Sequence, residues 1–122
     1  MKIKTSELTG KQLDYAVAMA EGYTPYTDGI SWIIDVGGAC TQLFKYSSKW
    51  VAGGPIIERE KIDVSFINSE YAARGEGWEA YCMTPDWKLQ YNAVGQTPLI
   101  AAMRAYVMAR LGDEVEVPEE LK

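Results

Sequence analysis

Histidine is absent from the sequence. Histidine is the side chain most often used as a general base near neutral pH, and it is a common ligand of transition metals. Its absence excludes the serine and cysteine triads that depend on an imidazole. We therefore expect no catalytic residues of this kind, no metal ion and no cofactor.

Cysteine and long apolar segments are also scarce. The two cysteines, Cys40 and Cys82, lie far apart in strand-like surroundings, so we expect buried thiols in a reducing compartment rather than a disulfide or a metal pair. No apolar run approaches the roughly 20 residues of a membrane-spanning helix. The basic start is followed by the polar segment 5–7 instead of the apolar core of a secretion signal. These features predict a cytoplasmic protein with no membrane partner.

Basic residues are outnumbered by acidic ones. The 122 residues include 12 Lys and Arg against 17 Asp and Glu, which gives a net charge of −5 at pH 7. Generic nucleic-acid binding depends on clustered Lys and Arg that release counterions, so we do not expect it here. The length is that of one domain. We expect a single domain over residues 1–122, with an acidic, solvated tail from about residue 113 in which a few apolar residues could hold it down.

Two amphipathic helices are predicted near the ends of the chain. Residues 97–112 form the clearer one, with Thr97 as N-cap, Pro98 at the first helical position and Gly112 at the end. An earlier helix begins after Thr9, whose hydroxyl we expect to cap it, and runs to Gly22. Lys11, Asp14 and Glu21 are expected on its solvated face.

Alternating apolar residues predict three strands over residues 62–66, 78–83 and 87–94, joined by links rich in Gly and Pro. An antiparallel meander of this kind needs one face covered, and the two helices supply the cover. The expected fold class is therefore α+β: a small antiparallel meander sheet covered by an N-terminal and a C-terminal helix. A further strand is expected over 30–36, a short one over 43–46, and a loop over 47–55.

Two backbone features are candidate anion sites. Gly53 and Gly54, before Pro55, could bring amides close to a phosphate, although a tight turn into the core explains them more simply. Thr97 at a helix start offers free amides and a favourable dipole, but ordinary capping explains it equally well.

Aromatic and arginine side chains suggest ligand binding more directly. The chain has four Trp and eight Tyr but only two Phe, a bias toward rings with a polar group that suit half-exposed platforms. Trp50 lies among small residues and is a candidate platform. Arg59 and Arg104 can clamp phosphate. Arg104 lies in a helix that is otherwise apolar, so its charge needs a partner, which is either a carboxylate such as Glu58 or Glu60 or a ligand phosphate.

An enzymatic alternative, the Mg²⁺-dependent hydrolysis of a nucleotide, rests on Glu58 and Glu60. In a strand, residues two apart share one face, so these carboxylates could hold Mg²⁺ or divide acid and base roles. Carboxylates at this spacing are common on solvated edges, and we rank this reading third.

Two long motifs resemble the NinX-like family of phage and prophage proteins. They are Gly53–Glu60, GGPIIERE, and Thr97–Arg104, TPLIAAMR. Shorter matching pieces include Leu13-Asp14 and Tyr46-Ser47, and the likeness runs nearly end to end. The family has no assigned activity, so the resemblance implies a phage accessory protein in the host bacterial cytoplasm and carries no catalytic residues with it.

From these observations we expect a non-enzymatic protein that binds, and thereby sequesters, a small nucleotide-like ligand. By analogy with phage proteins that take up nucleotide signals of host immunity, the ligand could be such a signal, and the protein a homo-oligomer. The expected binding residues are Trp50, Gly53, Gly54, Arg59, Thr97 and Arg104. The alternative is an adaptor that binds a host or phage protein through Trp50, with Arg104 purely structural.

Overall fold

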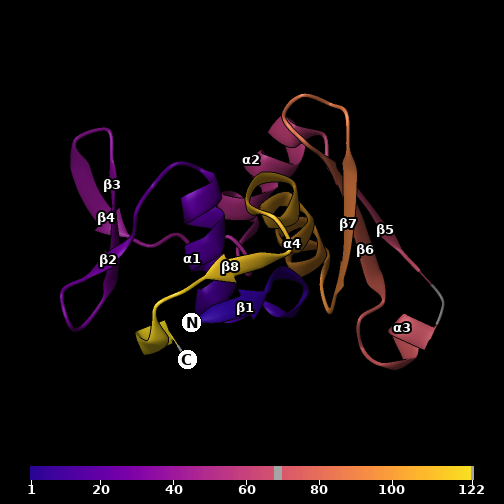
Figure 1. Cartoon of the computed structure of the whole chain (residues 1–122), viewed down its shortest axis with the longest axis horizontal. Coiled ribbons are helices and arrows are strands. Elements are labelled where there is room, and N and C mark those ends of the chain that lie inside the picture. Colours follow the sequence, from indigo (N-terminus) through magenta and orange to yellow (C-terminus); the bar gives the residue numbers. More distant parts are fainter. Residues whose placement is uncertain (68–69, 122) are drawn as a thin grey trace.

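The structure is a computed structural model that describes residues 1–67 and 70–121 (Figure 1). Its elements in chain order are β1 (Lys2–Lys4), a 3-10 turn (Thr5–Glu7), α1 (Gly10–Ala20), β2 (Tyr26–Thr27), β3 (Trp32–Val36), β4 (Ala39–Gln42), α2 (Trp50–Glu60), β5 (Asp63–Phe66), α3 (Glu70–Ala73), β6 (Trp78–Met83), β7 (Gln90–Gly95), α4 (Pro98–Leu111), β8 (Glu114–Glu116) and a 3-10 turn (Glu119–Leu121).

The strands β5, β6 and β7 form the predicted antiparallel meander, in that spatial order. α4 packs on this sheet, and α1 packs on α4 from the other side (Figure 1). The expected α+β class, with a meander covered by helices from the two ends of the chain, is confirmed. The last strand begins at Gln90 rather than at Trp87, because Trp87 lies in the hairpin turn with a φ of 62°.

α4 forms where its local signals place it. The hydroxyl of Thr97 accepts a hydrogen bond from the N–H of Ile100 at 3.1 Å, and Pro98 opens the helix. The alanines of α4 allow a close approach to the sheet. At Gly95 in β7, an added Cβ would lie 2.7 Å from the backbone nitrogen of Ala101. The helix therefore lies directly against the last strand of the meander.

α1 also begins after Thr9, as predicted, but two details of the prediction are wrong. The Thr9 side chain makes no capping hydrogen bond, although its backbone is extended as at an N-cap. Asp14 is buried rather than solvated, with 6% of its surface exposed, because the segment after β4 packs over this part of the helix. Asp14 therefore faces a part of the fold that helical periodicity alone does not indicate.

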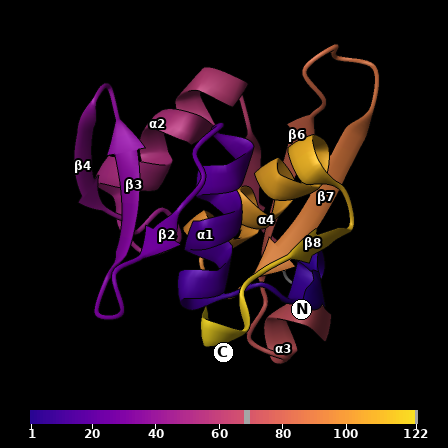
Figure 2. The ribbon, with the colours of Figure 1, turned by 60° about the vertical axis from the view of Figure 1, so that its left-hand side comes forward.

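A second sheet, in the order β2, β3, β4, stands beside α1, and we call it the arm (Figures 1 and 2). β3 and β4 are joined by Gly37 and Gly38, whose φ values are 60° and 86°. A tight hairpin turn of this kind requires positive φ at both of its central residues. The turn fixes the returning strand at 39–42, so the strand expected over 43–46 is absent from its predicted place. Cys40 is exposed on this strand, contrary to prediction, whereas Cys82 is buried.

The loop predicted over 47–55 is wrong in its second half, because Trp50–Glu60 forms α2. Two glycines and Pro55 gave the segment low intrinsic helix propensity. Tertiary packing overrides that propensity: Gly53 lies so close to the carbonyl of Tyr46 and to the side chain of Leu99 that no larger residue fits. The absence of a side chain here permits α2 to pack against the start of α4.

The acidic C-terminal segment is held to the body. β8 pairs antiparallel with β1, and the apolar residues Val115, Val117 and Leu121 are buried. The glutamates on either side of Val115 remain exposed. The acidic tail is therefore held to the body by its buried apolar residues and by the pairing of β8 with β1.

Candidate functional site

The residues predicted to bind a ligand do not converge on one cavity. Trp50 is exposed at the start of α2, with 57% of its surface accessible. Gly53 and Gly54 lie inside α2, and the N–H of Gly53 is bonded to the carbonyl of Lys49 at 3.0 Å. Thr97 caps α4. The candidate phosphate loop at Gly53 and Gly54 and the tight turn preferred to it are therefore both wrong, since the segment is helical and the N–H of Gly53 makes a helical hydrogen bond.

Arg104 has internal partners on three sides. Its Nε donates to the carbonyl of Leu8 at 2.8 Å, and its Nη1 donates to the carbonyl of Val94 at 2.8 Å and lies 3.4 Å from Glu76 Oε1. The residue is 6% exposed. These contacts join α4 to β7 and to the segment before α1, as the structural alternative expects, but the acidic partner is Glu76 and neither Glu58 nor Glu60.

Arg59 belongs to an ionic network that joins three helices. It binds both carboxylate oxygens of Glu21, at 3.1 and 2.6 Å, and its Nε donates to Glu60 at 2.7 Å. Glu60 also accepts from Arg110 at 2.7 Å, and the hydroxyl of Tyr106 donates to Glu21. Burial alone would raise the pKa of Glu21, but the hydrogen bonds from Arg59 and Tyr106 hold it below its usual value. The network ties α1, α2 and α4 together.

The premise of the enzymatic alternative is wrong. Glu58 and Glu60 lie on a helix rather than a strand, so two residues of separation turns their side chains to different faces. Glu58 is exposed, whereas Glu60 is engaged by two arginines. Among the described residues, no group of three or more Cys, Asp or Glu side chains is placed to hold a metal ion.

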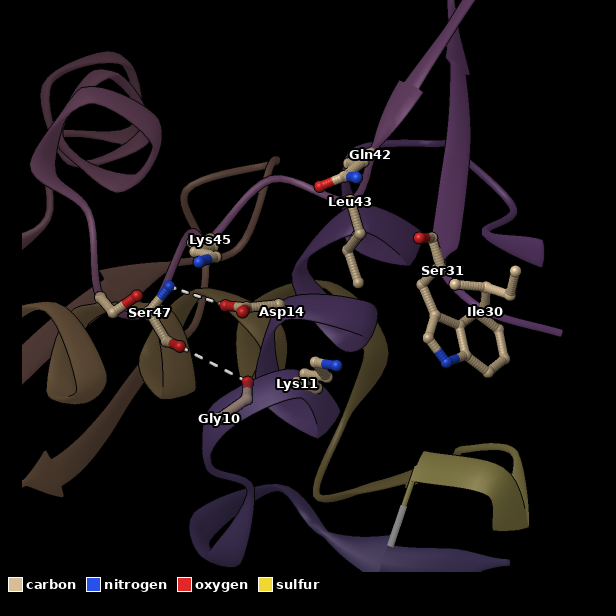
Figure 3. A pocket seen from close by; sticks show the side chains of 11 residues that line it. Gly10, Lys11, Asp14, Ile30, Ser31, Gln42, Leu43, Lys45 and Ser47 are labelled. Atoms are coloured by element: carbon tan, nitrogen blue, oxygen red, sulfur yellow. Dashed lines mark hydrogen bonds between the residues drawn. The ribbon is translucent and has the colours of Figure 1, made fainter. Parts of the chain in front are cut away.

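A different hollow, of about 440 Å³, lies between α1 and the arm (Figure 3). We call it the α1–arm pocket. α1 supplies one wall, the start of β3 a second, and the segment that leads from β4 to α2 a third. Its lining residues are Gly10, Lys11, Asp14, Ile30, Ser31, Trp32, Gln42, Leu43, Lys45, Ser47 and Ser48.

Asp14 fixes one side of this pocket. Its Oδ1 accepts the N–H of Ser47 at 2.8 Å, and the Ser47 hydroxyl lies 3.5 Å from the carbonyl of Gly10 (Figure 3). Burial raises the pKa of Asp14, while the bonds from Ser47 and the charge of Lys45 oppose that rise. Asp14 is therefore a positioning residue that holds the third wall against α1.

Two ammonium groups and one large ring give the α1–arm pocket its chemistry. Lys11 and Lys45 lie on either side of Asp14 in the view of Figure 3, and both residues are exposed. Trp32 packs edge-on against Tyr15 with ring centroids 5.7 Å apart, which fixes the orientation of its ring at the lining. Lysines and serine hydroxyls can donate to an anion, and an indole face can stack on a flat ring.

The sequence does not predict this pocket. Helical spacing places Asp14 on a solvated face, and no sequence pattern marks Lys45 or Trp32 as ligand-binding residues. One signal was available: the short motifs Leu13-Asp14 and Tyr46-Ser47, which support the family resemblance, contain the two residues that hydrogen-bond across the pocket. That the motifs meet in space follows only from the fold.

A second, more apolar hollow of about 290 Å³ lies beside α2. Aromatic rings and the outer face of α2 line it, with Glu21 and Arg59 at one end; the lining residues are Glu21, Tyr23, Phe44, Tyr46, Val51, Ala52, Pro55, Ile56 and Arg59. Val51 is 87% exposed at its lip. Arg59 is the predicted ligand-binding residue that lines a hollow, although its guanidinium is already bonded to two glutamates.

The chain is thus a small α+β protein with a ligand-sized pocket beside its first helix. The chain belongs to the phage family described as "Bacteriophage P22, NinX", which matches residues 4–110. This confirms the family resemblance. No curated protein matches the chain.

A solved structure described as a phage protein from Bacillus cereus ATCC 14579 is similar in fold. It superposes with a TM-score of 0.61 over 84% of this chain and 92% of the other, at 12% sequence identity. At that identity the likeness concerns the fold alone. Within the described part of this chain, no helix is both long and apolar enough to cross a bilayer.

Proposed function

We propose that this phage protein is a non-enzymatic accessory protein that binds a small nucleotide-like ligand in the α1–arm pocket. The observation that carries the proposal is the conjunction of Lys11, Lys45 and Trp32 at one hollow. Its volume of about 440 Å³ falls within the range of roughly 300–1,000 Å³ typical of small-molecule sites.

The lining favours a ligand that is anionic at one end and flat at the other. Lys11 and Lys45 attract a phosphate locally even though the whole chain is acidic. Ser31 and Ser48 add hydroxyls, while Trp32 offers an aromatic surface for a base. Such a ligand neutralises the two lysines and covers apolar surface in a single binding event.

The position of the one carboxylate in this pocket favours binding without turnover. Its carboxylate, Asp14, is 6% exposed and is bonded to the backbone of Ser47, so it is poorly placed to take a proton from a ligand. In the cytoplasm of a host bacterium, a protein that holds a nucleotide without consuming it acts as a sponge. Sequestering a nucleotide signal of host defence in this way would benefit a phage.

A thermal-shift panel tests the proposal, with 5′-mononucleotides, cyclic dinucleotides and ADP-ribose as probes. A ligand at 100 times its Kd should add about 2.7 kcal/mol to the free energy of unfolding and raise the melting temperature. The double variant Lys11→Ala/Lys45→Ala should lose the shift. Lys88→Ala, which removes an exposed lysine from the β6–β7 turn, should keep it. A shift that survives in the double variant would contradict the assignment to this pocket.

A second candidate function is that of an adaptor for a host or phage protein. The observation in its favour is the exposure of two adjacent apolar residues, Trp50 at 57% and Val51 at 87%, next to the apolar hollow beside α2. A flat ligand panel, together with capture of one dominant protein that Trp50→Ala abolishes, would favour this function over ligand binding.

A further inference from the structure

The outer edge of the arm carries unused backbone hydrogen-bonding groups. β4 pairs with β3 in the register Val36 with Ala39 and Ile34 with Thr41, and among the described residues no other strand pairs with it. All four residues of β4 are exposed. Both ribbon views place the arm at the margin of the molecule, away from the meander (Figures 1 and 2).

The register identifies which groups are free. The N–H of Leu43 donates to the carbonyl of Trp32 at 2.9 Å, so residue 43 directs its backbone groups toward β3. Because antiparallel bonding alternates along a strand, residues 39 and 41 also face β3, and Cys40 and Gln42 direct their N–H and C=O groups outward. The free edge therefore has its donors and acceptors at Cys40 and Gln42.

This edge lacks the usual protection against pairing. Natural edge strands commonly carry charged residues or proline that discourage another strand from adding to them. β1 has Lys2 and Lys4, β8 has Glu114 and Glu116, and β5 has Asp63. β7 is an uncharged edge strand as well, but the carbonyl of Val94 on it accepts a hydrogen bond from Arg104. β4 has the sequence Ala-Cys-Thr-Gln, with no charge and no proline.

We propose that β4 is a self-association edge, at which two copies of this chain pair their β4 strands antiparallel about a two-fold axis. With Thr41 facing its own copy on the axis, Cys40 of each chain exchanges both backbone bonds with Gln42 of the other. This register pairs the outward groups of Cys40 and Gln42, and it leaves no free β4 edge for a third chain.

Charge does not oppose a second copy at this place. The chain has a net charge of −5, so two copies repel each other over most of their surfaces. The uncharged β4 strand allows close approach without opposing like charges. Two short strands cover less surface than the roughly 1,200 Å² of a standard stable interface, so the dimer should dissociate on dilution. The proposal does not rest on a ligand in the α1–arm pocket, although Gln42 also lines that pocket.

Light scattering coupled to size-exclusion chromatography over a dilution series tests the proposal. The wild-type chain should have a two-chain mass at high concentration and move toward a one-chain mass on dilution. Thr41→Lys places like charges opposite each other on the axis and should weaken association at least tenfold. Ser65→Lys, which adds the same charge to an exposed residue of the edge strand β5, should associate like wild type.

Cross-linking tests the register. A non-hydrogen-bonded antiparallel pair has Cα atoms about 4.5 Å apart, a distance that a disulfide can bridge. Thr41→Cys in a Cys40→Ser background should therefore form a two-chain disulfide under mild oxidation, whereas Cys40→Ser alone should not. A one-chain mass at all concentrations, or a Thr41→Lys variant that dimerises as wild type does, would overturn the proposal. A dimeric wild type whose Thr41→Cys variant fails to cross-link would overturn the register.

Discussion

At the scale of single residues, neighbouring side chains in this protein have opposite roles. Gly53 and Gly54 are adjacent in the sequence and in α2, yet one faces the body and the other faces outward. An added Cβ at Gly53 would collide with the carbonyl of Tyr46 and lie 2.7 Å from the Leu99 side chain. At Gly54 the nearest atom would be Trp50 Cε3 at 3.6 Å, an ordinary contact.

The two alanine variants should therefore change stability in opposite directions. Gly53→Ala should lower the free energy of unfolding by about 1–3 kcal/mol, because the packed core must shift to admit the methyl group. Gly54→Ala should raise it by up to about 1 kcal/mol, because alanine is the better helix former. Urea unfolding followed by circular dichroism measures both. Equal destabilisation by the two variants would contradict the helical packing of this segment.

At the scale of elements, polar side chains determine how the helices meet. Arg104 joins α4 to β7 and to the segment before α1, because it donates hydrogen bonds to the carbonyls of Leu8 and Val94. The network of Glu21, Arg59 and Glu60 joins α1 and α2, and Arg110 extends it to α4. Arg104 is buried with its hydrogen bonds made, which is the condition under which burial is tolerated, whereas the network around Arg59 is partly exposed to solvent.

The ionic network predicts how stability depends on pH. The pKa of Glu21 is lower in the folded chain than its ordinary value, despite the opposing effect of burial. A lowered carboxyl pKa contributes stability that is present above the unfolded value and is lost as the pH falls through the folded value. Wild type should therefore lose stability below about pH 4.5.

Glu21→Gln isolates this contribution. Near pH 7 the variant should be less stable than wild type by about 1–2 kcal/mol, since Arg59 and Tyr106 lose a charged acceptor that is partly screened by solvent. The difference should shrink by about pH 3. Glu58→Gln, at an exposed position of α2, should follow the wild-type curve. Chemical unfolding at the two pH values measures the effect, and a constant difference between them would disprove the assignment.

At the scale of the whole molecule, the sequence predicts the layers better than the contacts between them. The caps and spacing of α4, and the alternation in β5 to β7, are local signals, and the elements formed where those signals lie. α2 is not indicated by local signals, because its glycines and proline oppose a helix, and contacts with distant segments such as Leu99 and Tyr46 stabilise it.

The site was harder to predict than the fold for the same physical reason. Arg104 needed a partner, and its main partners are backbone carbonyls at residues 8 and 94, which no pattern of side chains indicates. The α1–arm pocket exists only where the first helix meets the segment after β4. Residues 33 positions apart, Asp14 and Ser47, hold its walls together.

Binding of a small anionic, flat ligand in the α1–arm pocket can be tested by an amide chemical-shift titration with ADP-ribose and the other panel nucleotides. A bound nucleotide should perturb amides at Gly10–Asp14, around Trp32 and over Gln42–Ser48, and Lys11→Ala/Lys45→Ala should remove these perturbations. Perturbations confined to the apolar hollow around Val51 and Pro55, or spectra that no nucleotide changes, would contradict binding in this pocket.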